Sequence, residues 1–190
     1  MYSSWWCDAR LWRVLQQIDA DLAAAARAAG CPCGGVLHSA RYPRKPRGGP
    51  ADLDDDYRKR FSFCCAEEGC RERTTPPSAR FLGRKVYLGA VVVLATALRQ
   101  GSTPWRLRRL RELFGVSART LARWRDFWRV AFAESAFWRA ARGRFMPPVT
   151  ANGLPGALLE RFTGEQPLAL MLTFLAPITT TSWAGGGQAW

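Results

Sequence analysis

The chain has 190 residues and a formal net charge of +13, with 28 Lys and Arg residues against 15 Asp and Glu residues. Its 48% apolar and 12% aromatic content can bury enough surface to offset the entropy of ordering, which excludes a histone-like or protamine-like basic tail. The single histidine, His38, excludes sites that need a pair of histidines. The charge makes an acidic polymer the first partner to consider.

The positive charge is confined to the middle of the chain. Residues 71–144 hold 17 basic and 4 acidic side chains, whereas residues 1–70 and 145–190 are both nearly neutral. A codon bias would raise the arginine content along the whole chain. The confinement therefore favours one localised anionic partner.

No segment predicts export or membrane insertion. The N-terminus lacks the basic stretch and continuous apolar run of a signal peptide. The longest apolar stretch, residues 86–98, has about 13 residues, against about 20 in a transmembrane helix. We therefore expect a cytoplasmic, nucleoid-associated protein with no membrane partner and with reduced thiols.

The sequence predicts a mainly helical α+β protein that is built from four parts. These are an N-terminal amphipathic helix in residues 1–30, a zinc-ribbon-like module in 31–80, a helix-turn-helix domain in 81–146, and short C-terminal helices with a disordered tail in 147–190.

Residues 8–29 predict an amphipathic helix that ends at Gly30. Its apolar stripe, at helical spacing, consists of Leu11, Leu15, Ile18 and Leu22. After this helix the sequence changes to turns and short β-like runs, at VLHSARY, YRKRFSFCC and RERTT. These runs are too short and too polar to form a core alone, so a bound metal ion is expected to stabilise them.

Five of the six cysteines lie in this β-like segment, as a CPC knuckle and a CCxxxxC knuckle about 30 residues later. Two thiol pairs separated by β-like runs are typical of a zinc ribbon. Cys65 is preferred to Cys64 because its spacing to Cys70 closes a compact loop, and Cys64 is expected on the opposite side of the strand. His38 could replace one thiolate, but a surface position on its strand is favoured. The predicted ligands of one Zn²⁺ ion are Cys31, Cys33, Cys65 and Cys70.

Helices are predicted at about 84–99, 104–114, 118–131, 136–145, 155–163 and 166–175. The apolar first helix is expected to support the next two in a three-helix unit. Pro147 and Pro148 end the array of the first four, and the terminal AGGGQAW is expected to be disordered.

The segment that begins at Thr103 predicts a helix-turn-helix. Thr103 can cap a helix with Pro104 at its first position, and Gly115 can end it. Val116 is expected to be buried in the turn, and Ser117 can cap the second helix. The expected apolar side of the first helix consists of Leu107, Leu110, Leu113 and Phe114.

At about 100° per residue, the second helix has one apolar and one basic face. The apolar face consists of Leu121, Trp124 and Trp128. The opposite face presents Arg119, Ala122 and Arg123 near the N-terminus, where arginine can make a bidentate contact with guanine in a major groove. The predicted contacts with bases and phosphates are made by Arg106, Arg108, Arg109, Ser117, Arg119, Thr120, Arg123 and Asp126. The alternative is a solvated, arginine-rich helical hairpin.

The Cys-rich segment ending in RTTPPSARFLGRKVYLGAVVVL, followed by LFGVSARTLARW, resembles the DNA-binding region of bacterial insertion-sequence transposases and their small accessory proteins. The resemblance covers residues 31–132. It implies a zinc ribbon followed by a homeodomain-like helix-turn-helix that binds the inverted repeats of a transposable element. The CxC knuckle departs from the CxxC that is usual in that family. A self-sufficient transposase of this kind has three catalytic carboxylates, whereas residues 145–190 contain only Glu160 and Glu165.

The predicted function is sequence-specific binding of double-stranded DNA in transposition, by an accessory or N-terminal-type transposase protein. We expect no enzyme activity and no small-molecule substrate, because no set of nucleophile, base and stabilising group can be assembled from the sequence. One alternative is an adaptor that binds a separate transposase subunit, through its ribbon and the apolar PLALMLTFLA segment. Others are a zinc-containing transcriptional regulator and an RNA-binding protein.

Overall fold

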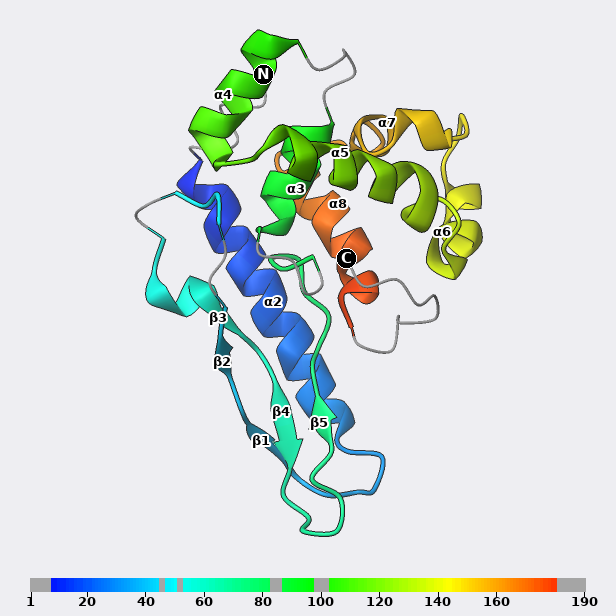
Figure 1. Ribbon diagram of the computed structural model, residues 1–190. Helices are drawn as coiled ribbons and strands as arrows, with labels where there is room; N and C mark the ends of the chain where they lie inside the picture. Colours follow the sequence, from blue (N-terminus) through cyan, green and yellow to red (C-terminus); the bar gives the residue numbers. More distant parts are fainter. Residues whose placement is uncertain (1–7, 45–46, 51–52, 83–86, 98–102, 181–190) are drawn as a thin grey trace.

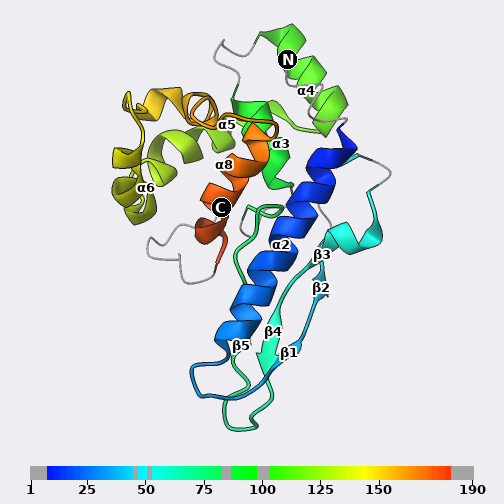
Figure 2. The ribbon, with the colours of Figure 1, turned by 180° about the vertical axis from the view of Figure 1, so that it is seen from behind.

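The computed structural model of the chain describes residues 8–44, 47–50, 53–82, 87–97 and 103–180. These residues form a mixed α+β structure that is mainly helical, as the sequence predicts. A long helix lies along a small antiparallel β-module, and the remaining helices gather around its N-terminal half (Figure 1). Figure 2 shows the same arrangement from behind.

The long helix, α2 (Ala9–Ala29), has the ends that its sequence predicts. The Asp8 carboxylate accepts a hydrogen bond from the backbone N–H of Arg10 at 2.9 Å and so caps the N-terminus. Gly30 follows the last turn with a φ of 73°, a left-handed conformation that favours glycine. The predicted and observed helices agree to within one residue at each end.

The buried face of α2 is rotated relative to the predicted stripe. Leu11 and Leu15 are buried as expected. The other predicted positions, which are only half-buried, are Ile18 and Leu22. The remaining buried positions are Trp12, Asp19 and Ala23. One cause of the rotation is Trp12, whose ring packs edge-on against the buried Tyr57 with 5.7 Å between centroids.

The described residues of the β-module form five short strands, which lie within the predicted runs except for Pro43. They are β1 (Leu37–Ser39), β2 (Tyr42–Pro43), β3 (Lys59–Arg60), β4 (Phe63–Cys65) and β5 (Arg73–Thr74), with a 3₁₀ turn η1 (Asp55–Arg58) before β3. Strands β1, β4 and β5 form an antiparallel sheet in the order β1-β4-β5, and β2 pairs with β3. The register places Leu37 opposite Cys65 and His38 opposite Cys64. Because neighbouring residues of a strand point to opposite faces, Cys64 and Cys65 lie on opposite faces of the sheet.

Each of the six predicted ranges contains a helix, but the helices predicted over 136–145 and 155–163 end early, at Ala141 and Leu159. The helices are α3 (Gly89–Thr96), α4 (Pro104–Phe114), α5 (Ala118–Asp126), the π-helix η2 (Phe127–Phe132), α6 (Ala136–Ala141), α7 (Gly156–Leu159) and α8 (Pro167–Leu175). Short 3₁₀ turns follow at η3 (Arg142–Arg144), η4 (Ala151–Gly153) and η5 (Ala176–Thr179). The first helix was expected to include Tyr87 and Leu88, but both form isolated β-bridges with other segments, so the helix begins at Gly89. The outermost residues of the predicted 84–99 helix, and the predicted disordered tail, lie outside the described residues.

The helix predicted over 118–131 changes from α to π geometry after Asp126. A π-helix advances about 80° per residue rather than about 100°, which brings Phe127, Trp128 and Phe132 onto one side. All three are buried, and the rings of Trp128 and Phe132 lie 5.1 Å apart. Aromatic packing against other elements favours this change. The periodicity of the sequence carries no information on such packing, so the π-helix was not predicted.

Helix α3 lies at the centre of the main core. Every residue from Gly89 to Thr96 is buried, and α3 packs against both α5 and α8. The same hydrophobic cluster includes Leu15 of α2 and Leu172 of α8. The apolar stretch is therefore a core helix, as its length predicts. It packs against the apolar face of α5.

One buried polar contact joins α3 to η2 within this core. The indole N–H of Trp128 donates to the Thr96 hydroxyl at 2.9 Å, and both side chains are buried. We expect Thr96→Val to lower the free energy of unfolding by roughly 1–3 kcal/mol, because it leaves the indole N–H without a partner. Urea denaturation measures the change. The matched control is Thr173→Val on the exposed side of α8, where the hydroxyl contacts only its own helix. An equal loss in the two variants would contradict the prediction.

Candidate metal centre and basic helical surface

The four cysteines selected from the sequence come together beyond the end of α2. They are Cys31 directly after Gly30, Cys33 in the turn that follows, Cys65 at the end of β4, and Cys70 in the turn before β5. Backbone hydrogen bonds close both turns. The Gly34 N–H donates to the Cys31 carbonyl at 2.8 Å, and the Cys70 N–H donates to the Glu67 carbonyl at 3.0 Å.

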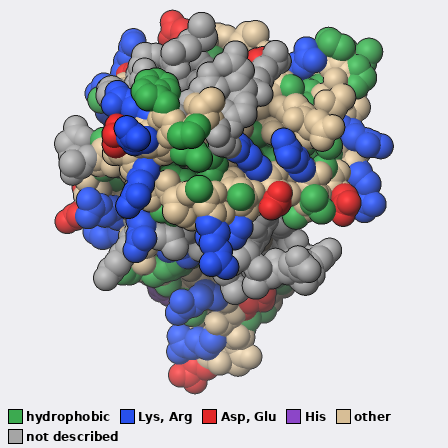
Figure 3. Space-filling model, turned by 45° about the horizontal axis from the view of Figure 1, so that its top comes forward, with side chains coloured by type: hydrophobic (Ala, Val, Ile, Leu, Met, Phe, Trp, Pro, Cys, Tyr) green, Lys and Arg blue, Asp and Glu red, His purple; other side chains and the backbone are tan. Residues whose placement is uncertain are grey.

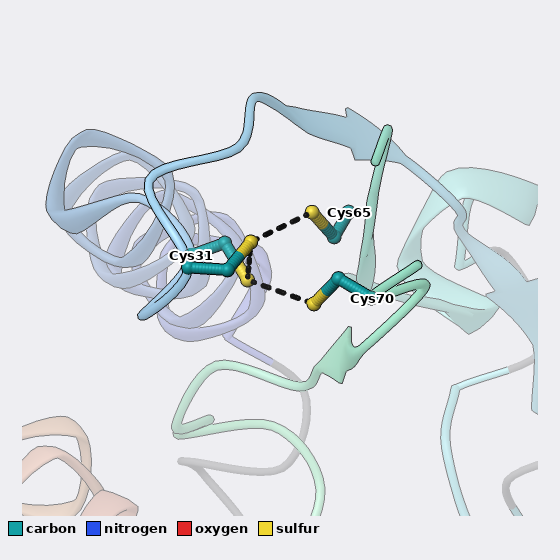
Figure 4. Close-up of side chains that lie close together, drawn as sticks. Cys31, Cys65 and Cys70 are labelled. Carbon is teal, nitrogen blue, oxygen red and sulfur yellow. Dashed lines mark hydrogen bonds between the residues drawn. The ribbon is translucent and has the colours of Figure 1, made fainter. Parts of the chain in front are cut away.

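The four sulfur atoms lie within 4.8 Å of one another, and none is in a disulfide. In Figure 4 the thiols of Cys31, Cys65 and Cys70 point toward one another from the two sides of the cluster. The sulfur of Cys33 lies 3.4 Å from that of Cys31 and 3.5 Å from that of Cys65. Tetrahedral zinc with Zn–S bonds of about 2.3 Å has S–S distances of about 3.8 Å. The cluster is therefore compact enough to hold one metal ion.

The backbone leaves this space open because residue 35 is glycine. A Cβ at Gly35 would lie 2.6 Å from the Cys65 sulfur and 3.2 Å from the Cys33 sulfur. Any side chain here would push the thiols apart. The Gly35 N–H instead donates to the Cys33 sulfur at 3.4 Å, which is the kind of amide contact that stabilises a thiolate.

The thiols of the cluster differ in their proton affinity. The hydrogen bond from the Gly35 amide, with those from the neighbouring thiols, lowers the pKa of Cys33 to about 7. The Cys33 amide lowers the pKa of Cys31, but burial and the neighbouring thiols outweigh it and raise that pKa to about 12. A cluster with one thiolate near neutral pH offers a first ligand to a soft divalent cation, and binding would release the remaining protons.

The two alternative ligands lie outside the cluster. His38 is exposed on β1, opposite Cys64 in the sheet register. The Cys64 sulfur lies 3.7 Å from the carbonyl oxygens of Cys65 and Arg71 instead of near the other thiols. The alternation of a β-strand therefore separates Cys64 from Cys65, as the sequence predicts.

A buried ion pair joins the β-module to α2, and neither of its residues was predicted from the sequence to have a role. Asp19 and Arg80 are each 1% exposed, and Nε of Arg80 lies 2.8 Å from Oδ2 of Asp19. The Asp19 carboxylate also accepts hydrogen bonds from the Ser78 hydroxyl at 2.5 Å and the Ala79 N–H at 2.6 Å. The available signal was an aspartate four residues after Leu15, on the face of α2 that is buried.

The turn between α4 and α5 has the predicted features. Gly115 has a φ of 63°, Val116 is buried, and the Ser117 hydroxyl accepts a hydrogen bond from the Thr120 N–H at 3.2 Å. The hydroxyl of Tyr87, just before α3, donates to the Gly115 carbonyl at 3.1 Å. The turn is therefore tied to the support helix as well as capped locally.

The two helices flanking this turn have separate apolar and polar faces. In α4, Leu110 and Phe114 are buried and Leu107 is half-buried, but Leu113 is 36% exposed. Leu113 was expected on the apolar side. It directly precedes the buried Phe114, and the helical rotation between the two residues turns its side chain toward the surface. In α5 and η2, the predicted apolar residues are all buried, namely Leu121, Trp124 and Trp128.

Most of the predicted DNA-contacting side chains are at the surface. The exposed ones are Arg108, Arg109, Ser117, Arg119, Arg123 and Asp126, and Thr120 is half-buried. Arg109 lies 3.6 Å from Glu112 in an exposed ion pair along α4. The side chain of Arg106 lies outside the described part of the chain. On the face drawn in Figure 3, Lys and Arg side chains outnumber those of Asp and Glu.

No helix in the described ranges is long and apolar enough to cross a membrane. Comparison with protein-family models, curated proteins and solved structures gave no match to this chain. Its function is therefore inferred from the thiol cluster and from the basic helical surface, which is formed by the exposed arginines of α4 and α5.

Proposed function

We propose that the chain binds duplex DNA in a sequence-specific manner, with α3, α4 and α5 acting as a homeodomain-like helix-turn-helix. The observation that carries the proposal is the division of α5 into two faces. Leu121 and Trp124 are buried, whereas Arg119, Ala122 and Arg123 are exposed near its N-terminus. A helix held by one face can enter the major groove with the other, where arginine can donate two hydrogen bonds to guanine.

Contacts with phosphates would complete the interface. Arg108 and Arg109 of α4 are exposed, and the N-terminal turn of α5 presents Ser117 and Thr120. Phosphate contacts of this kind fix the orientation of a protein on the duplex but do not read its sequence. Asp126, on the exposed face of α5, would accept a hydrogen bond from a cytosine amino group.

We also propose that Cys31, Cys33, Cys65 and Cys70 bind one Zn²⁺ ion in a zinc-ribbon-like module. Four thiolates would fill the tetrahedral shell and leave no position for a substrate, so the ion would stabilise the fold and not take part in catalysis. The open space beside Gly35 and the short sulfur–sulfur distances support this site.

A DNA-binding protein without its own catalytic residues fits an accessory or N-terminal-type protein of a transposable element. The resemblance of residues 31–132 to that family supports this assignment. The competing adaptor function is not favoured by the C-terminal apolar helix. In α8, the side chains of Leu168, Met171, Leu172 and Leu175 pack in the core of this chain, and Leu170 is exposed.

The test begins with selection of a binding site from random duplexes by the purified protein. Fluorescence anisotropy then measures affinity for the selected site at several salt concentrations. We expect Arg119→Ala and Arg123→Ala each to cost about 1–3 kcal/mol of binding free energy and to relax the preference at the contacted base pair.

The control removes the same number of charges elsewhere, through Arg27→Ala at the end of α2 and Arg73→Ala on β5, both exposed. These variants are expected to keep the base preference of the wild type. The proposal is wrong if the wild-type protein shows no salt-dependent binding to any duplex.

A further inference from the structure

A loop of the β-module lies against the turn between α4 and α5. Its residues 47–50 follow β2 and are far from this turn in the sequence. Arg47 forms a parallel β-bridge with Tyr87, whose hydroxyl donates to the Gly115 carbonyl at 3.1 Å. In both ribbon views the cyan segment after β2 passes beside the C-terminal end of α4 (Figures 1 and 2).

The close approach of this loop depends on Gly48. Its φ is 82°, and a Cβ at this position would lie 3.1 Å from both Cγ atoms of Val91. The same Cβ would lie 3.3 Å from the Phe114 carbonyl oxygen at the end of α4. The loop backbone is therefore fitted between α3 and α4, which fixes the position of the neighbouring Arg47 relative to the turn.

Arg47 is exposed at this position. None of the ion pairs found among the described residues involves it. The turn at Gly115 leads directly into the N-terminal end of α5, which carries Arg119 and Arg123. Arg47 is therefore an exposed cation in a loop that contacts the end of α4, beside the turn that leads into the proposed recognition helix.

We propose that the loop is a second DNA-contacting element, in which Arg47 binds a phosphate of the backbone that flanks the groove occupied by α5. The inference rests on the proposed function. A phosphate contact built into the turn would fix the depth and register of α5 in the groove without reading a base. It would also link the β-module to DNA binding, since the loop belongs to that module.

The test measures how the affinity of Arg47→Ala for the selected duplex depends on salt. One lost phosphate contact makes the slope of log K against log salt concentration less steep by about 0.9. The affinity loss relative to wild type is therefore expected to be about three- to fourfold larger at 50 mM than at 200 mM salt. The base preference is expected to stay unchanged, and Arg47→Lys is expected to restore the slope.

The matched control is Arg27→Ala, which removes one exposed charge at the opposite end of α2 from this loop. If Arg47→Ala and Arg27→Ala have the same slope while Arg119→Ala still loses base preference, the loop contact is wrong and the proposed function stands. A changed base preference with an unchanged slope also overturns it, because the contact would then be to a base. A wild-type protein without salt-dependent binding overturns both proposals.

Discussion

Replacement of Cys31 by Ser is expected to remove bound zinc from the chain and to unfold the β-module. The small hydrophobic cluster of this module has five buried residues, Ala23, Cys31, Leu37, Phe63 and Cys65, and the partly buried Ala26, Phe61 and Cys70 pack against them. Two of these five residues are proposed ligands, so the module has little core without the metal. Structural zinc contributes roughly 10 kcal/mol or more of folding free energy in small domains, which exceeds what so few apolar side chains supply.

Elemental analysis of freshly purified protein is expected to give about one zinc per chain for the wild type, and close to none for Cys31→Ser. Amide hydrogen exchange reports on the module itself. The amides of β1 and β4 are expected to lose their protection in the variant, and treatment of the wild type with a strong chelator should have the same effect.

The chain provides its own control in Cys64, which is next to a proposed ligand in sequence but lies on the opposite face of β4. Cys64→Ser is expected to keep both the zinc and the protection of the strands. A wild-type protein without metal would contradict the zinc site. Equal zinc loss in Cys31→Ser and Cys64→Ser would contradict the choice of ligands.

Loss of the metal should leave much of the helical part intact. Cys31 follows directly after α2, and Ala23 packs in the small cluster, so the C-terminal turns of α2 are expected to fray. Leu11 and Leu15 pack in the main core, and they hold the N-terminal half of the same helix. The circular dichroism spectrum of the metal-free protein is therefore expected to lose only part of the helical signal of the wild type.

The features predicted correctly from the sequence depend on residues close together in the chain. The two cysteines of each pair lie at or next to the same turn, so their spacing indicates a compact knuckle. Gly115 and Ser117 set the end of one helix and the start of the next through local backbone geometry and a local hydrogen bond. Strand alternation correctly separated Cys64 from Cys65. Such signals do not depend on the rest of the fold.

The features that were missed depend on contacts between distant segments. No local pattern pairs Asp19 with Arg80, or directs Gly48 to the end of α4. The π-helix is also a consequence of tertiary packing, since it brings Phe127 and Phe132 onto one side of the helix. A single sequence does not specify which of many polar residues will meet in the interior.

The ion pair between Asp19 and Arg80 is the strongest example. The Arg80 guanidinium donates to the carbonyl oxygens of Tyr57 at 2.8 Å and Lys59 at 3.0 Å, in addition to the Asp19 carboxylate. One buried arginine therefore connects α2 to the strand region that leads to the cysteine cluster. Its charge is neutralised by Asp19 alone among the ion pairs of the described residues.

Asp19→Ala is expected to lower the free energy of unfolding by about 3–5 kcal/mol, because it leaves the buried Arg80 charge without a counterion. It also removes the acceptor for the Ser78 hydroxyl and the Ala79 N–H. Urea denaturation followed by tryptophan fluorescence measures the loss. The control is Asp21→Ala on the exposed side of α2, where the carboxylate accepts a hydrogen bond from Gln17 at 2.9 Å.

A double-mutant cycle separates the pair from its surroundings. If the two charges stabilise each other, Asp19→Ala and Arg80→Ala together should cost less than the sum of the single losses, by about 0.5–3 kcal/mol. A loss for Asp19→Ala that is no larger than that for Asp21→Ala would show that the charge of Arg80 is satisfied by the backbone carbonyls. In that case the link between α2 and the β-module would depend on packing of apolar groups such as Trp12 against Tyr57.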